Sequence, residues 1–182
     1  MSAWLENKEA YRHYYDSHTV DKADPYRGYM GHFHPQDGES IVDLGCGTGA
    51  TVHHFTKLGH EVTGVECGKP YISQCHNQDG VFVESLIEEW VPDKRYDWAL
   101  LTEVLEHVID PAECLKVARE AADNLFVTAP TIKVGTEVHV RGVSPYELNE
   151  WLKEAGWTCK SMGLAFAHLG RQTYQQVVCE AL

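Results

Sequence analysis

The stretch Ile41–Gly49, IVDLGCGTG, places glycine at every second position directly after a short apolar run. Glycine loses more conformational entropy on folding than any other residue, so Gly45, Gly47 and Gly49 indicate a backbone that must turn sharply or approach a ligand closely. A strand that ends in a glycine-rich turn and leads into a helix is an arrangement with which α/β proteins bind nucleotide cofactors. The stretch therefore predicts a cofactor loop near the start of an α/β domain.

The composition around this stretch is that of an ordinary globular chain. The 182 residues are 43% hydrophobic and 23% charged, a balance typical of one folded domain, here expected to span residues 1–182. No apolar run approaches the roughly 20 residues that cross a bilayer, and the first residues lack a signal-peptide pattern. We therefore expect a cytoplasmic protein without a membrane span.

Charge and cysteine content exclude several classes of protein. The formal net charge is -12, which disfavours nucleic acid or a membrane surface as partner, because both attract basic proteins. The six cysteines form no CxxC pair, which argues against a structural zinc site. Several of them lie inside apolar, strand-like runs, where free cysteine behaves as a small buried hydrophobic residue, which argues against a disulfide framework. We expect reduced thiols.

Short β-branched runs alternate with helical patterns, which predicts an α/β fold with a largely parallel sheet. Strands are expected at residues 40–45, 61–66, 96–102, 124–130, 157–166 and 172–182, and helices at 50–58, from 110 and from 144. The last two helices carry clear start signals, since Asp110 and Ser144 are each followed by proline and, three positions on, by glutamate.

The first 35 residues differ from the expected core at 36–182. An amphipathic helix with Tyr11, Tyr14 and Tyr15 precedes an aromatic, loop-rich stretch. The tyrosines have helical spacing, which packing alone explains. We expect this segment to be an extension of the domain that serves as a lid.

Two classes of cofactor fit a glycine-rich turn of this kind. Dinucleotide enzymes show G-x-G-x-x-G, whereas this chain has G-x-G-x-G with Asp43 two residues before the first glycine. Glu66, at the end of the second expected strand, has the chemistry to accept hydrogen bonds from ribose hydroxyls. Both classes use such an acid, so Glu66 does not discriminate between them.

The ordered set VDLGCGTGA, VTGVE and YDWALLTEVLEHVIDP resembles the class I S-adenosylmethionine-dependent methyltransferase family. The resemblance implies a Rossmann-like, doubly wound seven-stranded sheet that is mostly parallel, with an antiparallel last strand. It implies S-adenosylmethionine as cofactor, bound by Asp43, Gly45, Cys46, Gly47, Glu66, Cys67, Ser85, Leu86 and Thr102. The chain departs from the family at the adenine turn, where Val83-Glu84 replaces a common Gly-Asp pair.

A second group of candidate functional residues follows the strand expected at 96–102. Glu103, Glu106 and His107 stand at i, i+3 and i+4, so a helical turn beginning at Glu103 would place all three on one side. That side would face the crevice beyond the strands' carboxyl ends, and His139 is expected in a loop that opens onto it. Two carboxylates and two imidazoles suit a Mg²⁺, Mn²⁺ or Zn²⁺ ion.

Two methyltransferase families are similar at these positions. The ubiquinone-biosynthesis O-methyltransferases have a comparable EVLEHV stretch, which implies catechol-like hydroxyls and a divalent ion. The small-RNA 3′-terminal 2′-O-methyltransferases use Glu, Glu, His and a later His as ligands, which implies Glu103, Glu106, His107 and His139 here. Without a metal, His107 or His139 has the chemistry of a catalytic general base. The remaining alternative is that these side chains only line the pocket.

The sequence thus predicts an S-adenosylmethionine-dependent methyltransferase, with a small molecule methylated on oxygen or nitrogen as first interpretation. An RNA ribose 2′-O-methyltransferase is the alternative, and its basic, aromatic groove would draw on Lys133, Arg141 and Lys153. A non-catalytic S-adenosylmethionine-binding partner subunit is another class, which Glu103, Glu106 and His107 disfavour. The glycine spacing disfavours a dehydrogenase, and the oligomeric state is left open.

Overall fold

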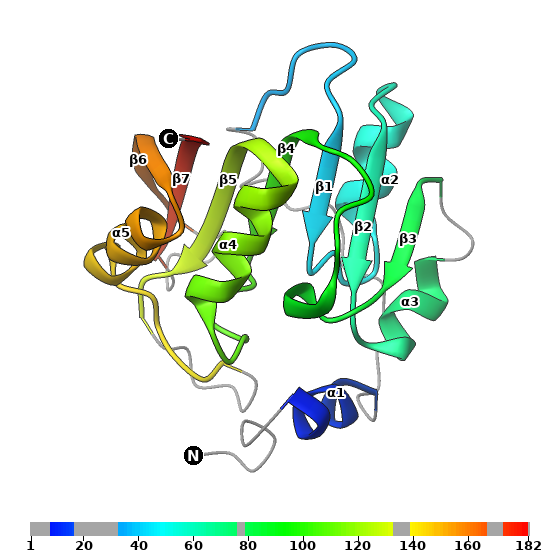
Figure 1. Ribbon diagram of the computed structural model, residues 1–182, viewed down its shortest axis with the longest axis horizontal. Helices are drawn as coiled ribbons and strands as arrows, with labels where there is room; N and C mark the ends of the chain where they lie inside the picture. The colour runs from blue at the N-terminus through cyan, green and yellow to red at the C-terminus, as the bar shows by residue number, and fades with distance from the viewer. Residues whose placement is uncertain (1–7, 17–32, 76–78, 133–138, 167–172, 182) are drawn as a thin grey trace.

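The computed structural model describes residues 8–16, 33–75, 79–132, 139–166 and 173–181. Its elements are α1 (Lys8–Asp16), β1 (Ile41–Leu44), α2 (Ala50–Lys57), β2 (Val62–Glu66), α3 (Lys69–Cys75), β3 (Val81–Glu84), the 3-10 helix η3 (Ile87–Glu89), β4 (Tyr96–Thr102), α4 (Pro111–Ala121), β5 (Ala122–Pro130), α5 (Pro145–Glu154), β6 (Trp157–Phe166) and β7 (Thr173–Ala181). The strands form one sheet in the order β3-β2-β1-β4-β5-β7-β6 (Figure 1).

Strand directions confirm the predicted class of fold. The pairs β1–β2, β1–β4, β2–β3 and β4–β5 are parallel, and β7 runs antiparallel to both of its neighbours, β5 and β6. The chain therefore forms the doubly wound sheet with an antiparallel last strand that the sequence predicts. None of the described helices is long and apolar enough to cross a bilayer.

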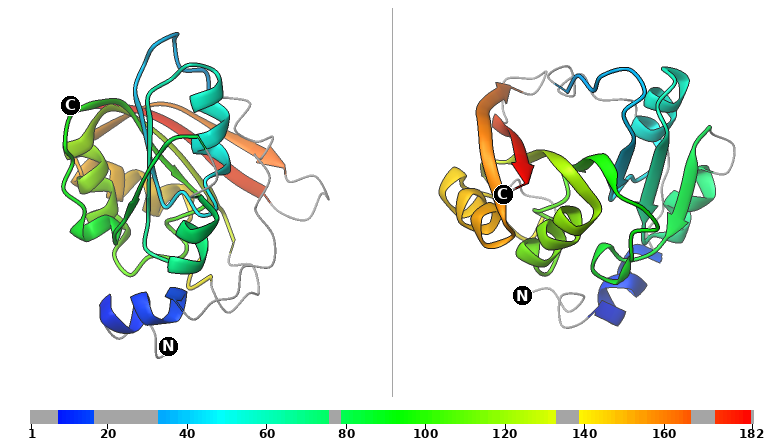
Figure 2. Two further views of the ribbon diagram at one scale, coloured as in Figure 1. Left: turned by 90° about the vertical axis from the view of Figure 1, so that its right-hand side faces the viewer. Right: turned by 45° about the horizontal axis from the view of Figure 1, so that its top comes forward.

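The central strands are apolar on both faces because helices cover both faces. Along β4, Leu101 belongs to the core under α4 and α5, whereas its neighbour Leu100 packs with Val52 and Phe55 of α2. Figure 2 shows α2 on one side of the sheet and α4 and α5 on the other. This two-sided burial explains the continuous apolar runs, which are typical of parallel strands.

Both predicted helix starts exist, and they differ in detail. At α5, Ser144 accepts a hydrogen bond from the Glu147 backbone N–H, and the Glu147 side chain accepts one from the Ser144 backbone, which completes a capping box. At α4, Asp110 accepts from the Glu113 N–H, but the Glu113 carboxylate lies 3.7 Å from Lys116 Nζ. The described contacts of α4 thus include the cap without the reciprocal bond.

Helix α3 and strand β3 were not predicted from the sequence. Strand β3 has only 4 residues, and Val81 and Glu84 at its ends are exposed, because β3 lies at the edge of the sheet. An edge strand buries too little to produce the apolar run by which the inner strands were recognised.

Helix α1 lies below the carboxyl ends of the parallel strands (Figure 1). Its Arg12 pairs with Glu89 at 2.8 Å, and Asp16 Oδ1 accepts a hydrogen bond from the Lys69 N–H at 3.2 Å. Tyr11 is buried. The N-terminal helix is thus joined to η3 and α3 on the side of the sheet where α/β proteins bind ligands.

Candidate functional site

The glycine loop after β1 has a backbone that only glycine adopts without strain. Gly45, Gly47 and Gly49 have φ values of 80°, 55° and 80°. A Cβ at Gly45 would lie 2.7 Å from Val104 Cγ2, whereas a Cβ at Gly47 would meet nothing within 4 Å. Gly45 therefore permits close packing, and Gly47 faces open space, as expected where a cofactor approaches the backbone.

The Glu66 carboxylate joins this loop to the start of α3. Its Oε2 accepts a hydrogen bond from the Gly47 N–H at 3.0 Å, and its Oε1 accepts one from the Gly68 N–H at 2.8 Å. Burial raises the pKa of Glu66, and the two backbone bonds oppose that rise because they stabilise the charged form. The acid that the sequence predicts at the ribose thus lies directly beside the glycine loop.

Asp43, in β1, is a second buried acid near the loop. It is 2% exposed, and its Oδ1 has no hydrogen-bond partner among the described residues. Burial, and then the charge of Glu66, raise the pKa of Asp43 to about 7. Asp43 is therefore a carboxyl group that changes charge near neutral pH.

The other predicted cofactor residues follow the ends of neighbouring strands. The Ser85 N–H, just after β3, donates to the Glu66 carbonyl at 3.0 Å, and Leu86 beside it is buried. Thr102 ends β4, and Cys46 and Cys67 follow β1 and β2, all three half-buried. The predicted residues thus line the carboxyl ends of β1 to β4, and their contacts with a cofactor stay a prediction.

Helix α1 covers the same region. The rings of Tyr11 and Tyr15 lie 4.9 Å apart between centroids. Burial is the main cause that raises the pKa of both tyrosines, and the charges of Cys67 and Glu66 add to it. The tyrosine side of α1 therefore lies near the acid of β2, and its role as a lid stays a prediction.

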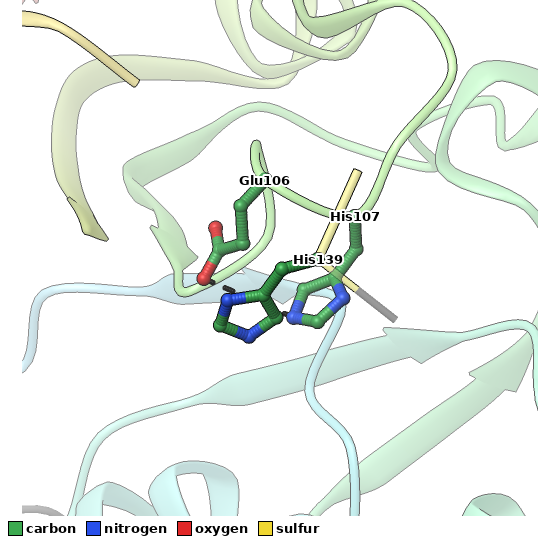
Figure 3. Close-up of side chains that lie close together, drawn as sticks. All are labelled: Glu106, His107 and His139. Atoms are coloured by element: carbon green, nitrogen blue, oxygen red, sulfur yellow. Dashed lines mark ion pairs between the residues drawn. The ribbon is translucent and has the colours of Figure 1, made fainter. Parts of the chain in front are cut away.

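The second cluster gathers Glu106, His107 and His139 (Figure 3). One potential ligand atom from each lies within 4.8 Å of the others. His107 Nε2 is 3.8 Å from Glu106 Oε1, and the two imidazole rings are 4.7 Å apart between centroids. Glu106 is fully buried. The segment that carries His139 is held there because the Val140 N–H donates to the Glu106 carbonyl at 3.0 Å.

Glu103 is not part of this cluster. The expected helical turn begins one residue later, since the His107 N–H donates to the Val104 carbonyl at 2.9 Å, and Glu103 has a left-handed φ of 58°. Its Oε1 accepts a hydrogen bond from Thr128 Oγ1 at 2.8 Å, which holds the side chain against β5. The structure therefore brings together three of the four predicted metal ligands.

One carboxylate and two imidazoles form a donor set that suits Zn²⁺ or Mn²⁺ better than Mg²⁺, which prefers oxygen ligands. Other histidines lie elsewhere: His53 Nδ1 accepts a hydrogen bond from the Asp79 N–H at 3.3 Å, and His34 is exposed. His32 and Lys133, also considered from the sequence, fall outside the described residues.

Val104 was not among the residues predicted from the sequence. It fills the space beside Gly45 and so joins the glycine loop to the turn that carries Glu106 and His107. No sequence signal marks this contact, because it arises from the pairing of β1 with β4.

Comparison with known proteins identifies the family of this chain. The methyltransferase domain family matches residues 11–161. The ubiquinone biosynthesis O-methyltransferase of Pseudoalteromonas translucida is 27% identical over 165 residues, covering 74% of this chain and 70% of that protein. The enzyme of the same name from Hahella chejuensis is 28% identical over 160 residues, covering 71% of this chain and 67% of that one.

Solved structures agree on the fold. A Methanosarcina mazei S-adenosylmethionine-dependent methyltransferase superposes with a TM-score of 0.73 at 14% identity, over 87% of this chain and 99% of that one. Magnesium protoporphyrin IX methyltransferase of Synechocystis, solved with bound S-adenosylhomocysteine, gives 0.68 at 12% identity, over 80% of this chain and 75% of that one. Because the family match extends from α1 into β6, this protein belongs to the class I S-adenosylmethionine-dependent methyltransferases and is an enzyme of that family.

Proposed function

We propose that this enzyme methylates a hydroxyl group of a small molecule, and that Glu106, His107 and His139 hold a divalent ion beside that hydroxyl. The observation that carries the proposal is the convergence of these three side chains within 4.8 Å. The turn bearing Glu106 and His107 begins at Val104, which packs against Gly45 of the glycine loop. The names of the similar O-methyltransferases support oxygen as the acceptor atom.

On the cofactor side, groups of the protein bind and orient S-adenosylmethionine. S-adenosylmethionine, when bound, supplies a methyl group activated by a sulfonium. Gly47 leaves open space above the backbone, and Glu66 accepts hydrogen bonds from the ribose hydroxyls. Since both Glu66 oxygens already accept backbone N–H groups, the carboxylate is fixed in place before the ribose arrives. Such preorganisation lowers the entropy cost of reaching the reactive geometry.

On the acceptor side, Glu106 contributes a buried carboxyl group, and His107 and His139 contribute ring nitrogens. A divalent ion, when bound, lowers the pKa of a hydroxyl on it and orients the oxygen. The competing assignment gives His107 or His139 the role of general base, which takes the hydroxyl proton directly. Both assignments use the same residues, and a metal titration separates them.

The described charges favour a small molecule over RNA. Arg141 donates to the Ile109 carbonyl at 3.2 Å, and Lys153 pairs with Glu150 at 3.0 Å. Two of the three basic side chains considered for an RNA groove therefore already have partners within the protein. The formal net charge of -12 adds a general repulsion for polyanions.

The test is calorimetric titration of chelator-treated protein with Mn²⁺ and, separately, with Zn²⁺, in the presence of S-adenosylhomocysteine. We expect one ion per chain in the wild type and at least tenfold weaker binding in Glu106→Gln, which keeps the shape of the side chain and removes its charge. His53→Gln, on α2, is the matched control and should bind the ion as the wild type does. Unchanged S-adenosylhomocysteine binding in Glu106→Gln would show that the fold is intact.

Transfer of a labelled methyl group to catechol then tests the reaction. Stimulation by the ion in the wild type and in His53→Gln, but not in Glu106→Gln, supports the proposal. Equal ion binding by Glu106→Gln and wild type would overturn the metal site. Full transfer in chelator with loss in His139→Gln would make His139 the base instead, and methylation of an oligoribonucleotide in preference to catechol would overturn the small-molecule assignment.

A further inference from the structure

Two of the six cysteines approach the glycine loop from different elements. Cys46 lies within the loop, and Cys75 is the last residue of α3. Their sulfur atoms lie 3.9 Å and 3.6 Å from the same acceptor, the Gly47 carbonyl oxygen. Cys75 is fully buried, and Cys46 is half-buried. The chain thus places a pair of thiols directly against the backbone that receives the cofactor.

The two sulfurs lie beside one carbonyl, and hydrogen bonding between them raises the pKa of Cys46 and lowers the pKa of Cys75. The thiolate is the form of cysteine that reacts with oxidants. Cys46 is the more exposed of the two, so peroxide reaches the pair from its side. Once one sulfur is oxidised, the other is positioned to close the disulfide.

We propose that Cys46 and Cys75 are a modification site, at which a peroxide forms a reversible disulfide that weakens S-adenosylmethionine binding. The inference relies on the glycine loop binding the cofactor. It does not depend on the acceptor or on a metal ion at Glu106.

The chemistry balances with hydrogen peroxide as the oxidant. The thiolate of one cysteine attacks one peroxide oxygen, the O–O bond breaks, and hydroxide leaves, so that its sulfur becomes a sulfenic acid. The sulfur of the other cysteine then attacks that sulfur, the S–S bond forms, and the sulfenic oxygen leaves as water with the second cysteine's proton. Two thiols and one peroxide give one disulfide and two waters, and a dithiol reductant reverses the change.

The Gly47 peptide explains why oxidation should affect the cofactor. Its N–H is held by Glu66 Oε2, and its carbonyl lies beside both thiols. A disulfide has no S–H, so oxidation leaves neither sulfur able to donate to that carbonyl. The two sulfur atoms must also come to about 2.05 Å, although Cys46 Sγ is already packed above Gly64, where a Cβ would lie only 2.7 Å from it.

The linkage must be reciprocal. If the disulfide weakens S-adenosylmethionine binding by a given factor, then bound S-adenosylmethionine disfavours the disulfide by the same factor. Saturating cofactor should therefore protect the pair from peroxide.

A second thiol pair provides a matched control. Cys159 and Cys179 lie directly opposite each other on β6 and β7, at the other end of the strand order from β2 and β3. If oxidation acts at the glycine loop, Cys159→Ser should therefore show the same peroxide-induced loss of S-adenosylmethionine affinity as the wild type.

The experiment measures S-adenosylmethionine binding by calorimetry on reduced protein, on protein treated with hydrogen peroxide, and after dithiothreitol. In parallel, acid-quenched samples are unfolded, alkylated and mapped by mass spectrometry. We expect a Cys46–Cys75 cross-link, at least tenfold weaker binding while it persists, and recovery with dithiothreitol. In Cys75→Ser, peroxide should leave the affinity for S-adenosylmethionine equal to that of the same variant when reduced. In Cys159→Ser, peroxide should weaken binding as it does in the wild type.

Free Cys46 and Cys75 after peroxide, or a cross-link that leaves affinity unchanged, would overturn the proposal. So would a Cys75→Ser protein that still responds, because the oxidised residue would then lie elsewhere. Reduced wild-type protein that binds no S-adenosylmethionine would instead contradict the cofactor assignment of the loop, so the two failures are distinguishable.

Discussion

Gly45 and Gly47 are two residues apart, yet they have different roles. Both have a positive φ, which costs about 1–2 kcal/mol in any residue with a Cβ. Only Gly45 has a neighbour, Val104, in the space that a Cβ would occupy. Gly45 is therefore required by the packing of the fold, whereas Gly47 is required by its positive φ and leaves the open face on which we propose that the cofactor lies.

The first prediction contrasts alanine at these two positions. Gly45→Ala should lower the free energy of unfolding by about 2–5 kcal/mol, because overpacking adds about 1–3 kcal/mol to the backbone strain. Gly47→Ala should cost only the strain but weaken S-adenosylmethionine binding at least tenfold. Urea unfolding and calorimetry on both variants provide the check, and equal losses of stability would refute the distinction.

The burial of Asp43 makes the stability of the fold depend on pH. Its pKa of about 7 lies well above the ordinary value of 3.8, so between these two values the folded protein holds a proton that the unfolded chain has released. Because the native state binds more protons in that window, this group's contribution to stability falls as pH rises from about 4 to about 7.

The second prediction follows from that sign. Asp43→Asn removes the titration, so the stability of the variant minus that of the wild type should grow between pH 4 and 7 and then level off. The total gain should not exceed about 4 kcal/mol, since each pKa unit corresponds to about 1.36 kcal/mol. Urea unfolding at several pH values without cofactor measures the difference, and a constant offset across this range would show that Asp43 is not the titrating group.

At the scale of elements, local signals define helix α5 best. Ser144 and Glu147 satisfy each other's backbone N–H groups, and Leu148 and Leu152 are buried within the core that α5 covers. The start of this helix was predictable because every group involved lies within four residues of sequence.

The third prediction concerns this cap. Ser144→Ala should lower the free energy of unfolding by about 1 kcal/mol, which corresponds to roughly 2–4 °C in Tm for a chain of this length. Ser161→Ala, exposed on β6, is the control and should leave Tm unchanged. Differential scanning calorimetry decides, and a Tm for Ser144→Ala equal to that of the control would mean that the cap contributes nothing.

The turn at 104–108 shows the limit of local reasoning. The i, i+3, i+4 spacing predicted one face for Glu103, Glu106 and His107. The structure separates Glu103 from the other two because its N–H and its carboxylate both bond to Thr128. Thr128 is 25 residues away in the chain, so no local pattern could have shown that competing partner.

For the molecule as a whole, the residue pattern predicted the order of the main elements, and the family resemblance implied the direction of the last strand. It left out α3 and β3, since a 7-residue helix and a 4-residue edge strand carry weak periodic signals. The meeting of His139 with Glu106, and of Cys75 with Cys46, depends on how segments far apart in the chain pack together. Such convergence can be proposed from residue types, but only a three-dimensional arrangement provides the distances.

The contact between Val104 and Gly45 also constrains how this enzyme can evolve. In the proposed site Gly45 lies beside the cofactor and Val104 begins the turn beside the methyl acceptor, and the two residues pack directly against each other. A mutation that adds bulk at position 45 would push the two halves apart, and in-line transfer tolerates little change in the separation of its reacting atoms. Position 45 should therefore remain glycine among homologues, because its φ of 80° disfavours any residue with a Cβ, and position 104 should remain close to valine in size, while the acceptor pocket diversifies around them.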